Sequence, residues 1–83
     1  MIDELVCSNK VVGLKQTVRA IDEENVSKVF LACDISPDIF EKISIMCKEK
    51  GIEVEHIKTM KEIGNICKID VPAAVAAILK NVL

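Results

Sequence analysis

The residues best suited to chemistry are Lys15 and Arg19, which belong to a stretch with three cations and no acid between residues 8 and 21. They are four residues apart, so a helix would place both on one face. If that helix begins at Gly13, its first N–H groups and its dipole would also attract anions. The pattern predicts a positive face, suited to phosphate, within a protein of net charge −2.

The overall composition, taken alone, speaks against a nucleic-acid partner. The sequence pI is about 5.3, whereas neutralising phosphates requires lysine and arginine. Phe30 and Phe40 are the only aromatic residues, which is too few for a surface that stacks single-stranded bases. The acids are concentrated in residues 22–24, 34–41 and 49–55, so the distribution of charge carries more information than its sum.

The cysteines show no metal-binding pattern. Cys7, Cys33, Cys47 and Cys67 form no C-x-x-C pair, and His56 is close in sequence to none of them. The spacing therefore predicts no metal site. Each cysteine lies in an apolar run, which favours buried thiols, and His56 is expected on the surface of a strand.

The elements that must position these residues follow from the hydrophobic pattern, in one domain spanning residues 1–83. We expect one or two helical turns in 2–8, strands at 11–12, 28–33, 52–57 and 73–79, and helices at 14–24, 37–50 and 60–66. Ser36 before Pro37 and Thr59 are typical helix caps. The alternation predicts an α/β fold, a three-layer α/β/α sandwich with a four-stranded mixed sheet.

Three motifs occur in order along the chain: V-V-G-L-K-Q-T-V-R-A-I at 11–21, F-L-A-C-D-I-S-P at 30–37 and M-K-E-I-G-N-I-C-K-I-D-V-P-A-A at 60–74. Together they resemble the kink-turn RNA-binding ribosomal-protein family, whose archetype is the archaeal large-subunit protein L-seven-Ae and whose bacterial members are of the YbxF and YlxQ type. The resemblance covers nearly the whole chain. It implies the three-layer fold and binding to kink-turns, which are RNA helices bent by a bulge next to tandem sheared G·A pairs.

The resemblance also implies which residues contact RNA. The RNA-binding helix would start with Gly13 and Leu14, and its polar side chains would reach base edges and phosphates from Lys15, Gln16 and Arg19. The loop beside the extruded bulge nucleotide would comprise Ile69, Asp70, Val71 and Pro72.

The chain departs from the family pattern at three places. Lys15-Gln16 stands where many archaeal and eukaryotic members carry Asn-Glu, and it is similar to the bacterial variant. Lys68 stands where glycine is common, and Val71 where some members carry arginine. Taken without the resemblance, Ile69 and Val71 could also be ordinary core residues.

We therefore expect a non-catalytic, monomeric, cytoplasmic protein without cofactor, metal or membrane segment, whose partner is a structured RNA such as rRNA or a riboswitch. One alternative is a ribosome-associated protein-interaction module that uses an apolar patch at 69–72. Another is an enzyme in which Cys33, at a strand end before the helix starting at Ser36, has a lowered pKa. No clear base accompanies that thiol, because His56 lies on another strand.

Overall fold

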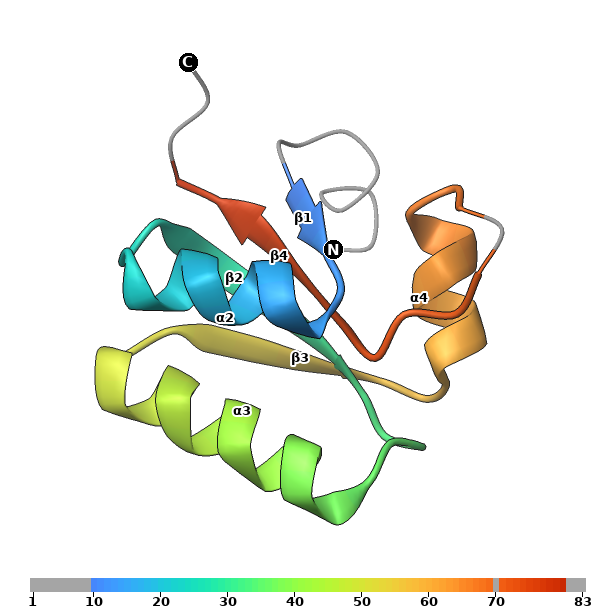
Figure 1. Ribbon diagram of the computed structural model, residues 1–83, viewed down its shortest axis with the longest axis horizontal. Helices are drawn as coiled ribbons and strands as arrows, with labels where there is room; N and C mark the ends of the chain where they lie inside the picture. Colours follow the sequence, from blue (N-terminus) through green and yellow to red (C-terminus); the bar gives the residue numbers. More distant parts are fainter. Residues whose placement is uncertain (1–9, 70, 81–83) are drawn as a thin grey trace.

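The described part of the chain, residues 10–69 and 71–80, alternates strands and helices in this computed structural model (Figure 1). The elements are β1 (Lys10–Val12), α2 (Leu14–Asp22), β2 (Val26–Ala32), α3 (Pro37–Lys50), β3 (Glu53–Ile57), α4 (Met60–Ile66) and β4 (Val75–Leu79). Every strand and helix predicted within these residues is present, including the alanine-rich strand that is β4. The turns expected in 2–8 lie outside the described residues.

The four strands form one mixed sheet in the order β1-β4-β2-β3. β2 and β3 are parallel, whereas β4 runs antiparallel to both of its neighbours, β1 and β2. Helices α2 and α3 cover one face of the sheet and α4 covers the other, which confirms the predicted three-layer sandwich (Figure 1).

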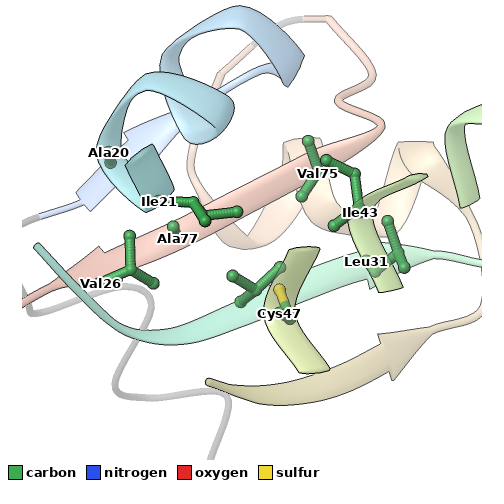
Figure 2. Packing of buried hydrophobic residues seen from close by; sticks show 9 residues of the cluster. Ala20, Ile21, Val26, Leu31, Ile43, Cys47, Val75 and Ala77 are labelled. Atoms are coloured by element: carbon green, nitrogen blue, oxygen red, sulfur yellow. The ribbon is translucent and has the colours of Figure 1, made fainter. Parts of the chain in front are cut away.

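The two central strands are apolar along their length because both of their faces are covered. One face of the two strands packs with Ile21, Ile43 and Cys47 of α2 and α3 (Figure 2). The strand residues on this face are Val29, Leu31, Val75 and Ala77. The alternate side chains pack with Ile63 and Cys67 on the α4 side; they are Phe30, Ala32, Ala76 and Ile78. Each of the two central strands, β2 and β4, therefore contributes side chains to two hydrophobic cores, one on each face of the sheet.

The helix starts follow the capping residues of the sequence. The Ser36 hydroxyl accepts a hydrogen bond from the Ile39 N–H at 3.3 Å, ahead of Pro37 at the first helical position. The Thr59 hydroxyl accepts one from the Glu62 N–H at 3.1 Å. Both caps satisfy N–H groups that the first turn of a helix leaves without a partner.

All three helices end in the same way, with one residue in the left-handed conformation: Glu24 (φ 56°), Gly51 (φ 68°) and Lys68 (φ 62°). The residue after each of these donates its N–H back to a carbonyl five residues earlier, as Ile69 does to Gly64 at 3.0 Å. This is the Schellman arrangement, in which glycine is the usual left-handed residue. α2 consequently ends at Asp22, two residues earlier than predicted.

Lys68 adopts the conformation that glycine tolerates best, at the position where the family resemblance expects glycine. Lys68→Gly should therefore raise the free energy of unfolding by about 0.5–1 kcal/mol, because the relief of left-handed strain exceeds the entropy that glycine adds to the unfolded chain. The midpoint of urea unfolding measures the change. Lys48→Gly, in the interior of α3, is the control and should destabilise; a similar loss for both variants would contradict the assignment.

Candidate nucleic-acid interface

The start of α2 and the start of β4 lie at one end of the sheet. β1, β2 and β3 all end there and β4 begins there, because β4 is antiparallel to its neighbours and β2 is parallel to β3. The starts of α2, α3 and α4 and the segment from α4 to β4 consequently lie at this end (Figure 1).

A backbone hydrogen bond joins the start of α2 to the start of β4. The Gly13 N–H donates to the Val75 carbonyl at 2.8 Å, and the Gly13 carbonyl accepts from the Thr17 N–H at 3.0 Å. Gly13 has φ 102°, which only glycine adopts readily, and a Cβ there would point into open space. The first turn of α2 has no side-chain cap and no acidic residue, so its N–H groups are available to an anion.

The polar face of α2 is exposed and brings the three predicted RNA-contacting side chains together. Lys15, Gln16 and Arg19 line one shallow groove of about 570 Å³, which we call the α2 groove; Val18, Asp22 and Glu23 complete it. The Arg19 side chain is 77% exposed, and its Nε lies 3.9 Å from a carboxylate oxygen of Glu23. Leu14 is half-buried and packs against the core beneath α2.

In the loop after α4, one aliphatic side chain packs against the core and another is exposed at the surface. Ile69 is half-buried and packs against the core on the α4 side, as an ordinary core residue would. Val71 is 61% exposed, which is unusual for a large aliphatic side chain, and Pro72 is exposed beside it. Asp70, the remaining predicted member of the loop, lies outside the described residues.

A second groove, of about 340 Å³, lies between α4 and this loop. We call it the α4 groove; its lining residues are Lys61, Asn65, Ile69, Val71 and Pro72. The two grooves have different lining residues, and the α2 groove extends along the helix to Asp22 and Glu23 at its far end, so the structure places the polar and the apolar candidates in separate depressions.

Gly64 lets the loop lie directly against α4. A Cβ at this position would overlap the carbonyl oxygen of Val71 and come within 3.4 Å of the Cα of Pro72. Sequence reasoning overlooked this residue, although a glycine inside a helical pattern is a known sign of close packing. It also did not identify Lys61 and Asn65 as lining a groove, because the position of the loop forms that groove.

Further hydrogen bonds hold the loop in place. The Ala73 N–H donates to the Met60 carbonyl at 3.1 Å, and the Ala32 N–H donates to the Ala74 carbonyl at 2.9 Å. The Met60 N–H in turn donates to a carboxylate oxygen of Asp34 at 2.9 Å. The loop is thus fixed to α4 and β2 before any ligand arrives.

The cysteines and His56 give little support to catalysis. Cys47 and Cys67 are buried, and burial raises the pKa of both thiols. Cys33 is exposed, so the prediction of a buried thiol is wrong there: the residue follows the last residue of β2, beyond the cover of the helices. His56 is exposed on β3, as predicted, and its ring stacks on Phe40 with centroids 5.3 Å apart.

Residues 10–69 and 71–80 contain neither a metal-binding cluster nor a helix that could cross a membrane. Within them, no group of three or more His, Cys, Asp or Glu side chains is arranged to hold a metal ion. No helix in this part of the chain has the length and apolar character needed to cross a membrane.

Comparison with known proteins places this arrangement in a family. An RNA-binding protein of Caldanaerobacter subterraneus subsp. tengcongensis is 47% identical over 68 residues, covering 82% of this chain and 83% of that protein. RNA-binding protein YbxF of Geobacillus stearothermophilus is 40% identical over 70 residues, covering 84% of this chain and 85% of that protein.

Among solved structures, the Giardia lamblia 15.5kD RNA binding protein superposes with a TM-score of 0.83 at 22% identity, covering 96% of this chain and 68% of that one, which shows the shared fold. The model of the ribosomal protein L7Ae/L30e/S12e/Gadd45 family matches residues 5–82. The chain therefore belongs to the ribosomal protein L7Ae/L30e/S12e/Gadd45 family.

Proposed function

We propose that this protein binds kink-turn RNA and stabilises its bent form. The contacts would come from the start of α2 (Gly13, Leu14, Lys15, Gln16 and Arg19) and from the loop Ile69–Pro72. The observation that carries the proposal is the Gly13–Val75 hydrogen bond, which holds an uncapped cationic helix start next to a segment with exposed aliphatic side chains. Relatives named as RNA-binding proteins support it.

A bent RNA suits these residues better than a regular duplex does. The major groove of a regular RNA helix is too narrow for side chains to read, so recognition favours distorted sites with unstacked nucleotides. The N–H groups of α2 and the side chains of Lys15 and Arg19 would take phosphates, and the Gln16 amide can donate to and accept from a purine edge. Val71 and Pro72 offer an unstacked base an aliphatic surface.

The test is to compare the affinity of the protein for two naked RNAs of equal length. One contains a bulge followed by tandem G·A pairs, and the other has the bulge deleted and Watson–Crick pairs in place of G·A. We expect at least about tenfold tighter binding to the first, equivalent to 1.4 kcal/mol. Equal affinity would refute kink-turn recognition, and no binding to either RNA would favour a module that binds only protein.

We further propose that the protein acts as a non-catalytic monomer in the cytoplasm, without cofactor.

The number of phosphate contacts should be small, because the chain as a whole is acidic. With about three to five contacts, a plot of log affinity against log salt concentration should have a slope of roughly −2 to −4.5. Titration between low and moderate salt measures this slope. A slope of zero would exclude phosphate contacts, and a slope near that of a strongly basic protein would mean that more lysines take part than the α2 groove supplies.

Glu23 should weaken RNA binding, because its carboxylate lies beside Arg19 and would compete with a phosphate. Both side chains are exposed, so the pair contributes at most about 1 kcal/mol. Glu23→Gln should therefore tighten binding of the kink-turn RNA by roughly two- to fivefold. Glu41→Gln, on α3, makes the same change in net charge at an exposed residue that does not line the α2 groove, and it is the control. Equal tightening by both variants would show a general charge effect instead.

A further inference from the structure

β3 forms one edge of the sheet. It comes last in the strand order, and among the described strands only β2 pairs with it. The Ile57 carbonyl accepts a hydrogen bond from the Cys33 N–H at 2.8 Å, so the peptide groups of Ile57 point toward β2. Peptide groups alternate in direction along a strand, so those of Val54 and His56 point to the outer edge. This edge therefore offers N–H and C=O groups to a further strand.

A groove lies beside this edge, between β3 and α4. It has a volume of about 440 Å³, which is within the range of ligand pockets, and we call it the β3 groove. Ile57 and Ile66 line it with apolar atoms. Glu55 and Glu62 line it with carboxylates, against one ammonium group, that of Lys58. The β3 groove thus combines apolar and acidic linings beside peptide groups that can bond to a strand.

Glu62 is the carboxylate best placed to bind a cationic ligand. The residue is exposed, and its side chain makes no ion pair with any other residue in the described part of the chain. Glu55 differs, because one of its carboxylate oxygens lies 2.9 Å from the Lys28 Nζ. A cation that enters the β3 groove would therefore meet Glu62 without displacing an existing partner of that carboxylate.

We propose that the outer edge of β3 and the β3 groove bind an extended cationic segment of a partner protein, which adds to the sheet as a further strand. The backbone of the segment would bond to the outward peptide groups of Val54 and His56. An arginine of the segment would lay its aliphatic stem on Ile57 and Ile66 and bring its guanidinium to Glu62. This interaction does not depend on RNA binding.

The opposite face of the added strand would lie toward α3. Val54 packs with the core on that side, and the exposed His56 ring stacks on Phe40 with centroids 5.3 Å apart. Successive side chains of a strand point to opposite faces, so residues that alternate with the cations would lie beside this ring pair. Valine or threonine suits these positions, because β-branched side chains pack well beside aromatic ones. The expected segment therefore alternates cationic and β-branched residues.

The charges disfavour a second copy of the chain as the occupant. In an antiparallel pair of two β3 strands, Glu53 and Glu55 of each copy would lie on the same face as the β3 groove of the other. Like charges on neighbouring strands destabilise a sheet. The carboxylates would also repel the phosphates of an RNA. A cationic protein segment is the ligand that the charge of this edge complements.

The test uses the full chain and synthetic peptides of about nine residues, a common strand length, in which arginine alternates with valine or threonine. We expect the arginine peptide to bind one to one. The same peptide with glutamate in place of arginine should bind at least about tenfold more weakly. In the complex, hydrogen exchange at the Val54 and His56 amides should slow by at least about tenfold, because both N–H groups become bonded.

Methylation of the peptide nitrogens distinguishes strand pairing from charge attraction alone. Only alternate N–H groups of an added strand point toward β3. Methylating one alternate set should weaken binding by at least about tenfold, whereas methylating the other set should leave it within about twofold. Equal losses from both sets, or no loss from either, would overturn the inference.

Glu62→Lys should bind the arginine peptide at least about fivefold more weakly, because it replaces the attraction of the guanidinium by repulsion. Glu41→Lys makes the same charge reversal at an exposed residue of α3 that does not line the β3 groove, and it should bind within about twofold of the unaltered protein. Circular dichroism checks that both variants fold. Equal weakening in the two variants overturns the inference, and so does a protein that sediments as a dimer with its Val54 and His56 amides protected before peptide is added.

Discussion

Arg19→Ala is expected to weaken the binding of kink-turn RNA by about 1–3 kcal/mol, or roughly 5- to 150-fold. The Arg19 side chain lines the α2 groove and is 77% exposed, and it lies one turn beyond Lys15 on the same face of the helix. Its fork of N–H donors matches two oxygens of a phosphate or two acceptors of a guanine edge. Titration calorimetry or gel-shift with the bulged, G·A-containing RNA measures the loss.

A second substitution distinguishes the contribution of the planar guanidinium of Arg19 from that of its positive charge. Arg19→Lys keeps the charge but loses the planar fork, so a bidentate contact predicts that its affinity falls between those of the unaltered protein and Arg19→Ala. Within residues 10–69 and 71–80, the ion pair of this side chain is the exposed one with Glu23, so neither variant should change the unfolding midpoint measurably. Unchanged affinity in Arg19→Ala would remove this residue from the interface.

Gly64→Ala is expected to lower the free energy of unfolding by about 1–3 kcal/mol and to weaken RNA binding as well. The added methyl group would overlap the Val71 carbonyl, and that carbonyl belongs to backbone that cannot rotate away as a side chain can. Relief of the overlap must move the loop, and with it the exposed aliphatic wall of the α4 groove. Urea unfolding and RNA titration of the same variant measure the two effects.

The direction of the stability change is itself diagnostic. In the interior of an unobstructed helix, replacing glycine by alanine stabilises by up to about 1 kcal/mol, because alanine has the higher helix propensity. Ser44→Ala, in the interior of α3, is a matched control that adds no atoms near the loop. If Gly64→Ala were more stable than the unaltered protein, the loop could not lie as closely against α4 as the structure has it.

Local structure was predictable wherever one residue type determines it. Ser36 and Thr59 begin helices because their hydroxyls accept N–H bonds from the first turn, and Gly51 ends α3 because it tolerates a positive φ. The strand at 73–79 was predictable from the alternation of elements, although its alanines favour helix. Its place between two other strands accounts for the apolar run.

Other features depend on tertiary contacts that the sequence does not specify. Cys33 follows an apolar strand, but its exposure depends on where the chain leaves the sheet. Ile69 and Val71 are similar aliphatic residues two positions apart, and only the direction of the loop decides which of them is buried. The pairing of Gly13 with Val75 requires β4 to lie beside β1, which is a property of strand order.

The central claim, that the α2 start and the loop after α4 together select a bent RNA, is tested most directly by the shape of the RNA. A kink-turn RNA with a donor and an acceptor fluorophore at its two ends can be titrated with the protein without divalent ions. If the protein binds the bent conformer preferentially, energy transfer should rise and saturate at one protein per RNA. Lys15→Ala and Val71→Ala should each shift the titration to higher protein concentration. Binding that saturates with no change in transfer, or equal binding to the straight control RNA, would contradict the claim.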